Sequence, residues 1–131
     1  MEERVFTPGE ATQTLPLVRH IVGDILQTGV LIRERAAALG SNAEKDPALV
    51  RAMEQLEELF EELEALGCAY RDWNFSLGLV DFPSVIDGKE VLLCWRSDEP
   101  ELRYYHELDA GYAGRRPIPP EYFTAQAKEG T

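Results

Sequence analysis

The residue types best suited to chemistry gather in one stretch of the chain, between residues 78 and 118. His106, Glu107 and Asp109 place an imidazole and two carboxylates close together. Such groups act as general acids and bases, or they bind a divalent metal ion. Arg115 and Arg116 follow in a glycine-containing segment, and guanidinium groups bind anions through paired hydrogen bonds. We therefore expect the functional site in this stretch.

Two kinds of site fit these residues. Neighbouring side chains of a strand point to opposite faces, so His106, Glu107 and Asp109 could share a metal only where a strand ends. An anion held by loop amides together with Arg115 and Arg116 is the better supported alternative. The sequence contains no HExxH pattern, no nucleophile elbow and no phosphate-binding glycine loop.

The region that carries these residues alternates apolar and polar positions, which is typical of strands. Asp87 and Gly88 between two such runs are a strong signal for a hairpin turn. Pro83 in the first run favours an edge strand or a bulge. The predicted strands are Leu79–Ile86, Lys89–Arg96 and Glu101–Glu107, with Cys68–Trp73 as a candidate leading strand.

The hairpin turn predicts which side chains share a face. It sets Asp81 opposite Cys94, and a four-residue second loop would set Arg103 opposite Cys94 from the other side. Arg96 would lie diagonal to Asp81. The functional interpretation is an anion site built by Arg96 and Arg103. The structural alternative is a ladder of ion pairs on a solvated face, which is the commoner arrangement.

The same register turns His106 toward the opposite face, with Trp95 and the rest of the core. A buried, hydrogen-bonded histidine is then the structural alternative to a ligand or a base. It also separates Cys94 from His106, which argues against a thiol nucleophile with a histidine base.

The first half of the chain predicts two helices that form an antiparallel hairpin. Thr7 and Glu10 form a capping box, which predicts a short helix to about Thr14. Pro16 either kinks that helix or starts the next one. The longer helices are predicted over residues 16–39 and 47–66, and Asp46 and Gly67 are the expected caps of the second.

The predicted helices carry more apolar surface than one hairpin can bury. In the second helix a coiled-coil seam follows the spacing four, three, four, three. The surplus predicts contact with the sheet and with a second copy, in a four-helix homodimer. The seam consists of Leu49, Met53, Leu56, Phe60 and Leu63.

Composition excludes several classes of protein. The chain has 131 residues, which suits one domain, and a net charge of −11, which disfavours nucleic-acid binding because no basic surface is available. Residues 44–66 hold eight acidic and two basic residues. Cys68 and Cys94 lack metal-finger spacing and are expected to be free thiols. We expect no membrane span and no secretion signal, and therefore a cytoplasmic protein.

Four segments stand out in combination: VFTPGEATQTLPLVR, GLVDFP, DGKEVLLCWR and EPELRYYHELDAGYAGRRPI. Together they resemble a small bacterial family, domain-of-unknown-function family 2203. The resemblance covers nearly the whole chain and is most specific over residues 78–118. It implies a compact bacterial protein, and it implies no reaction and no catalytic residue.

The sequence thus predicts an α+β fold, with a long helical hairpin packed on a three- to four-stranded antiparallel meander. One domain would comprise the hairpin (1–67), the meander with its Gly-Arg loop (68–118) and a tail (119–131). The favoured function is a non-catalytic binding or interaction module that forms a helical dimer and presents the sheet to a small anionic ligand or a protein. The alternative is a small enzyme acting on an anionic molecule, with or without a divalent metal. Its residues would be His106, Glu107 and Asp109, with Arg115 and Arg116 as an anion clamp.

Overall fold

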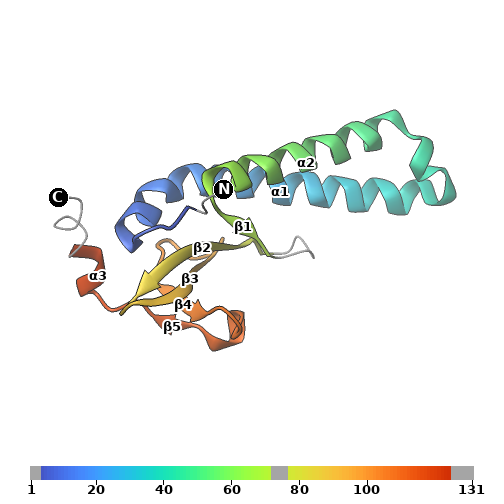
Figure 1. Cartoon of the computed structure of the whole chain (residues 1–131). Helices are drawn as coiled ribbons and strands as arrows, with labels where there is room; N and C mark the ends of the chain where they lie inside the picture. Colours follow the sequence, from blue (N-terminus) through green and yellow to red (C-terminus); the bar gives the residue numbers. More distant parts are fainter. Residues whose placement is uncertain (1–3, 72–76, 125–131) are drawn as a thin grey trace.

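The computed structural model describes residues 4–71 and 77–124. It confirms the α+β class: two long helices form a hairpin that lies along one face of an antiparallel sheet (Figure 1). The elements are α1 (Pro8–Leu39), η1 (Gly40–Lys45), α2 (Pro47–Leu66), β1 (Ala69–Tyr70), β2 (Leu79–Ile86), β3 (Lys89–Arg96), β4 (Tyr104–Glu107), η2 (Tyr112–Gly114), β5 (Arg116–Pro117) and α3 (Glu121–Thr124).

Helix α1 begins at the predicted capping box. The Thr7 hydroxyl accepts the Glu10 N–H at 3.1 Å, and the Glu10 carboxylate accepts the Thr7 N–H at 2.9 Å. The predicted end of a first helix near Thr14 is wrong, as is a second helix starting at Pro16, because α1 continues through Pro16. Ala11 and Leu15 before the proline and Val18 after it are all buried in the same core. Packing on both sides therefore outweighs the one backbone hydrogen bond that a proline removes.

Helix α2 has both predicted caps. Asp46 accepts the Leu49 N–H at 2.9 Å, and Gly67 ends the helix with a left-handed φ of 97°. The predicted seam is wrong at Met53, whose exposed fraction is 54%. The buried stripe is rotated toward the predicted flank, because α2 must face α1 and the sheet together. Its buried members are Leu49, Ala52, Leu59 and Leu63.

The far half of the hairpin extends beyond the sheet (Figure 1). Accordingly, α1 has no buried residue after Gly29. By length and composition alone, α1 could cross a membrane, but core helices of soluble proteins pass the same test. The part of α1 up to Gly29 packs into the core, as in such a helix. The apolar side chains left exposed on this half are Val30, Leu31, Val50 and Met53.

The sheet has five strands in sequential order, all antiparallel. Asp87 and Gly88 form the predicted turn, with positive φ angles of 55° and 75°. The pairing of β2 with β3 is continuous through Pro83, so the bulge considered there does not form. Instead the Pro83 carbonyl accepts the Phe6 N–H at 2.7 Å, which covers this part of the sheet edge. Of the candidate leading strand Cys68–Trp73, residues Ala69 and Tyr70 form β1, and residues 72 and 73 lie outside the described ranges. Strand β5 was not predicted.

The register between β3 and β4 differs from the predicted one by one residue. Cys94 lies opposite Tyr104, where Arg103 was expected, and Leu92 lies opposite His106. Because side chains alternate along a strand, this slip moves every β4 side chain to the other face. His106 therefore lies on the face away from the helices, where the prediction had it on the core face. It is buried as expected, with an exposed fraction of 4%.

The face toward the helices carries the apolar core. It joins residues of α1, α2 and the sheet in one cluster, closed at the chain's C-terminal side by Ile118. Trp95 at its centre is fully buried, and its indole N–H donates to the Glu99 carbonyl at 2.9 Å. The other fully buried members from β2 and β3 are Val80, Phe82 and Leu93.

Candidate metal centre

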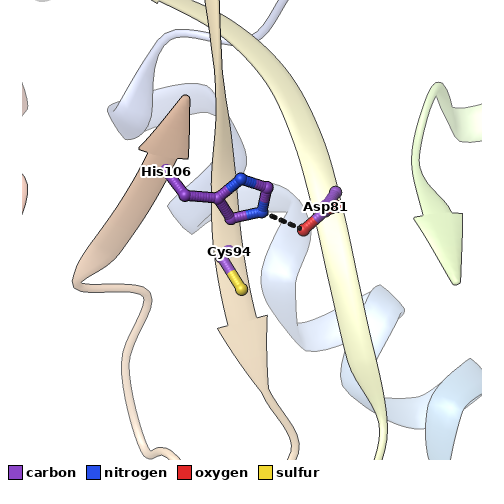
Figure 2. A group of neighbouring side chains, drawn as sticks. All are labelled: Asp81, Cys94 and His106. Atoms are coloured by element: carbon purple, nitrogen blue, oxygen red, sulfur yellow. Dashed lines mark hydrogen bonds and ion pairs between the residues drawn. The ribbon is translucent and has the colours of Figure 1, made fainter. Parts of the chain in front are cut away.

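Three chemically capable side chains meet on the sheet face that points away from the helices. Asp81 of β2, Cys94 of β3 and His106 of β4 come from neighbouring strands and lie on one side of the sheet (Figure 2). Their donor atoms all lie within 4.8 Å of one another. The exposed fractions of the three residues are only 5%, 2% and 4%, in that order. Buried polar groups require partners, so this cluster needs an explanation.

The histidine ring is oriented by the backbone. His106 Nδ1 lies 2.8 Å from the Glu107 carbonyl oxygen, which can only accept, so Nδ1 carries a hydrogen atom. The other ring nitrogen, Nε2, points at Asp81 Oδ1 at 3.3 Å (Figure 2). Three states satisfy this geometry. The ring is an imidazolium paired with Asp81, or it is neutral and accepts a hydrogen bond from a protonated Asp81, or it is neutral and its Nε2 lone pair shares a cation with the carboxylate.

The cationic side chain of Arg71 binds the other carboxylate oxygen of Asp81. Arg71 Nε donates to Asp81 Oδ2 at 3.2 Å, and the arginine side chain is 56% exposed while that of Asp81 is 6% exposed. Asp81 thus receives Arg71 on one oxygen and faces His106 with the other. An oriented carboxylate with one oxygen aimed into a cluster is the usual arrangement of a metal ligand supported by its neighbours.

Cys94 is protonated in this environment. Burial raises the pKa of its thiol to about 12, and the negative charge of Asp81 adds to the rise, while Arg115 opposes it. The other cysteine, Cys68, also has its pKa raised to about 12 by burial. A neutral thiol at physiological pH is a poor nucleophile, which disfavours unassisted thiol catalysis. A coordinated metal ion removes this obstacle, because it deprotonates the thiol outright.

A cavity opens beside the three donors. Its volume is about 410 Å³, and the donor residues themselves form part of its wall. This volume lies within the range of small-molecule sites, about 300–1,000 Å³. Arg71 and Tyr112 also line it, together with the apolar side chains of Leu79, Leu92 and Leu108.

The Gly-Arg loop covers the neighbouring part of the same face. Arg115 donates to Glu99 at 2.6 Å and lies over the rings of Tyr104 and Tyr112, at 4.1 and 4.7 Å from their centroids. Gly111 permits the turn with a φ of 69°. Arg115 is therefore a largely buried structural element of this loop, with a side-chain exposed fraction of 11%.

The structure does not bring the predicted residue set together. Glu107 pairs with Lys89 at 3.1 Å and lies 3.8 Å from Arg116, while Asp109 is exposed in the following turn. Within the described ranges, the one group of three potential metal ligands is Asp81, Cys94 and His106. The predicted ligands Glu107 and Asp109 do not belong to it. The reason is alternation, since Glu107 points to the opposite face from His106.

Each arginine that the sequence suggested for anion binding has a carboxylate partner. Arg96 bonds Asp98 at 2.5 Å, and Arg103 bonds Glu101 at 2.8 Å. Arg115 and Arg116 contact Glu99 and Glu107 as described above. The predicted row with Asp81 therefore contains Tyr104 in place of Arg103, and the cation beside Asp81 is Arg71.

The cluster has the chemistry of a zinc site. Zinc binds thiolate, imidazole and carboxylate ligands at about 2.0–2.3 Å, so two ligand atoms on one tetrahedral ion lie about 3.3–3.8 Å apart. The 3.3 Å between His106 Nε2 and Asp81 Oδ1 is close to this value. It is also slightly longer than an ordinary N–H···O bond of about 2.7–3.2 Å. The Cys94 sulfur lies within 4.8 Å of both atoms.

Residues 4–118 match the model of a protein family described as an uncharacterized conserved protein, DUF2203. The chain belongs to this family. No curated protein matches the chain, and no solved structure does. The family match covers all three donors of the cluster and ends just before the tail, so the sheet and its outer face are part of the family's domain.

Sequence reasoning placed Asp81 opposite Cys94 and named His106 as a possible ligand, but it did not bring the three residues together. The Asp81–Cys94 pairing followed from the hairpin turn and is confirmed. The loop before β4 is one residue longer than the predicted four, and this places His106 on the same face as Cys94. Counting that loop from sequence was the step that failed.

Proposed function

We propose that this protein binds a zinc ion through Asp81, Cys94 and His106. The observation that carries the proposal is the orientation of His106. Its Nδ1–H is committed to a backbone carbonyl, so Nε2 faces the Asp81 carboxylate and the Cys94 thiol. Metal-bound histidines almost always donate their other ring N–H in this way. One thiolate, one imidazole and one carboxylate form a ligand set that zinc accepts.

The charge of the buried cluster supports the same proposal. Without a metal, a buried carboxylate lies within 4.8 Å of a thiol whose pKa is raised to about 12, by burial first and by the charge of Asp81 in addition. Zinc binding releases the thiol proton and leaves two anionic ligands around a divalent cation. The two anionic ligands then balance the zinc ion inside the buried cluster, and the charge left over is that of Arg71, whose side chain is 56% exposed.

The test is zinc binding by the full chain, measured by competition with a chromophoric chelator. We expect one zinc ion per chain. Asp81→Asn, Cys94→Ser and His106→Gln should each weaken binding by about 100-fold or more, since each removes one of three ligands. Cys68→Ser is the matched control, because it removes the other buried thiol and should leave zinc affinity unchanged.

Two results would overturn the proposal. One is the absence of zinc binding by the folded wild-type chain. The other is an equal loss of affinity in Cys68→Ser and Cys94→Ser. In either case the cluster would be a buried ion pair of His106 with Asp81, whose role is to stabilise the sheet. Circular dichroism of each variant shows whether it is folded before its affinity is compared.

We also propose that the far half of the hairpin binds a second copy of this chain. Leu31 and Met53, with exposed fractions of 53% and 54%, give this half an apolar surface. Residues 44–66 are strongly acidic, whereas the end of α1 carries Arg33 and Arg35. An antiparallel pairing would set α1 of one copy against α2 of the other, which joins opposite charges.

Light scattering at micromolar concentration tests the dimer. We expect twice the mass of one chain for the wild type, and a single-chain mass for Leu31→Glu. Leu17→Glu is the matched control, because Leu17 is 49% exposed on the same helix but lies in its first half, away from Leu31 in the sequence. A wild type that remains a single chain throughout this range rules out the dimer.

The enzyme hypothesis built on His106, Glu107 and Asp109 has less support from the contacts. Glu107 is engaged with Lys89, and Arg115 with Glu99. A catalytic role would instead use the zinc cluster and its cavity.

A further inference from the structure

The proposed zinc site has fewer ligands than zinc requires. Zinc is nearly always four-coordinate in proteins, and sites with three protein ligands keep the fourth position for water or substrate. Within residues 4–71 and 77–124, the group around His106 contains three potential donors and no fourth histidine, cysteine or carboxylate. A zinc ion held there would therefore keep one position open.

The open position faces the cavity. Asp81, Cys94 and His106 all form part of the cavity wall, so an ion between them borders the cavity directly. The core side of the sheet is closed to a ligand, because alternate residues such as Leu93 and Trp95 fill it completely. A ligand can therefore reach the ion from the cavity.

Charge selects the kind of ligand. Thiolate and carboxylate together balance the two charges of zinc, and the neutral imidazole adds none. The positive charge of Arg71, at the mouth of the cluster, is then not balanced by any of the three zinc ligands. Its contact with Asp81 uses the Nε–H, one of five guanidinium N–H groups, and the side chain lines the cavity. An anionic oxygen ligand would meet both the ion and Arg71.

The remaining lining of the cavity favours a ligand whose hydrocarbon part is apolar. Leu79, Leu92 and Leu108 line the cavity, and its volume of about 410 Å³ suits a molecule of a few carbon atoms. On these grounds we infer that the open zinc position binds the carboxylate of a small apolar organic acid, with Arg71 as its second contact. This inference rests on the proposed zinc site.

The experiment uses the full chain loaded with cobalt(II), which replaces zinc and is visible in absorption spectra. A thiolate-to-cobalt band reports the metal site, and the visible d–d bands report the number of ligands. Isovalerate is the probe, with isoamyl alcohol as its uncharged analogue and inorganic phosphate as an anion without an apolar body. We expect isovalerate to change the d–d bands, phosphate to bind more weakly, and the alcohol to have no effect.

Arg71→Gln should raise the isovalerate dissociation constant about 10–100-fold, the usual contribution of a hydrogen bond to a charged group. Arg71→Lys, which keeps the charge, should recover part of the affinity. Arg103→Gln, which removes an exposed arginine paired with Glu101, is the matched control and should change nothing.

Leu108→Asp is a second variant that does not touch the cluster's hydrogen bonds. It places a negative charge at the cavity, so it should abolish isovalerate binding while the cobalt band persists.

The outcomes separate this inference from the zinc proposal. If no thiolate–cobalt band forms, the zinc proposal itself fails. If the band forms but isovalerate leaves the d–d bands unchanged, the zinc site stands and the open position is overturned. If phosphate binds more tightly than isovalerate, or if Arg71→Gln binds isovalerate as the wild type does, the assigned ligand class is wrong.

Discussion

The two faces of the sheet bury side chains of opposite character. Toward the helices, Leu93 and Trp95 are fully buried among apolar neighbours. Away from the helices, Cys94 between them is almost as deeply buried, yet it lies against a carboxylate and an imidazole. Apolar burial stabilises a fold, whereas polar burial is unfavourable unless every group is paired. The inner face therefore stabilises the fold, and the outer face carries the cluster that we propose as a zinc site.

The largest effect that this comparison predicts is on the inner face. Trp95→Ala should lower the free energy of unfolding by about 3–5 kcal/mol, the usual loss for a large buried aromatic residue. It also removes the indole hydrogen bond to Glu99 and the contact with Arg19, whose guanidinium lies 5.1 Å from the ring centroid. Urea denaturation without zinc measures the loss.

Cys94→Ala in the same zinc-free experiment is the outer-face counterpart. It should lower the free energy of unfolding by about 1 kcal/mol, a typical value for a single substitution. An equal loss in the two variants would contradict the division of roles, because the outer cluster would then be a stabilising element in its own right.

Zinc should distinguish Cys68 from Cys94 by its effect on the stability of their alanine variants. At 100 to 1,000 times its dissociation constant, a ligand that binds only the folded chain adds about 2.7–4.1 kcal/mol. The wild type and Cys68→Ala should both gain this stabilisation, and Cys94→Ala should not. Thermal melting with and without zinc measures the gain for each chain. A gain that survives in Cys94→Ala would place the bound zinc elsewhere.

The sequence predicted one half of this face and missed the other for a physical reason. The turn at Asp87 and Gly88 is determined by local backbone preference, so the pairing of Asp81 with Cys94 could be derived from residues close in the chain. The loop between β3 and β4 depends on contacts that are distant in the chain. Glu99 accepts the Arg96 N–H at 2.9 Å and also binds Arg115 from the later loop. Its length, and thus the face of His106, could not be counted from local signals.

The helices illustrate the same limit. Caps are local, and Thr7, Asp46 and Gly67 were all predicted correctly. The side of α2 that is buried is not local, because α1 and the sheet compete for it. Met53 belonged to the best heptad seam and is nevertheless exposed. Periodicity therefore identified the helix but could not choose between two neighbouring stripes.

The pH dependence of the two thiols gives a finer comparison. Burial raises the pKa of Cys68 and of Cys94 from about 9 to about 12. The unfolded chain therefore loses these protons first, so the zinc-free protein should be most stable below pH 9 and lose stability as the pH rises toward 12. Cys68→Ala and Cys94→Ala should each reduce this alkaline loss.

Zinc should distinguish the two thiols again. A bound Cys94 has already given its proton to the solvent, so the apparent zinc affinity should rise with pH by up to about tenfold per unit through this thiol. In the zinc-loaded chain the remaining alkaline loss of stability should come from Cys68 and disappear in Cys68→Ala. Zinc affinity that is independent of pH would show that no thiol proton is released, and Cys94 would then not be a ligand.

The smallest expected effect concerns the arginine that the sequence placed in the row beside Asp81. Arg103 is 63% exposed and bonds Glu101, which is itself 64% exposed. Exposed ion pairs contribute little, so Arg103→Ala should change the free energy of unfolding by less than about 0.5 kcal/mol and leave zinc affinity unchanged. Arg71 is nearly as exposed, at 56%, but it bonds a carboxylate that is buried in the cluster. If Arg71→Ala and Arg103→Ala weakened zinc binding equally, the effect would be general electrostatics, and the specific support that Arg71 gives to Asp81 would have no basis.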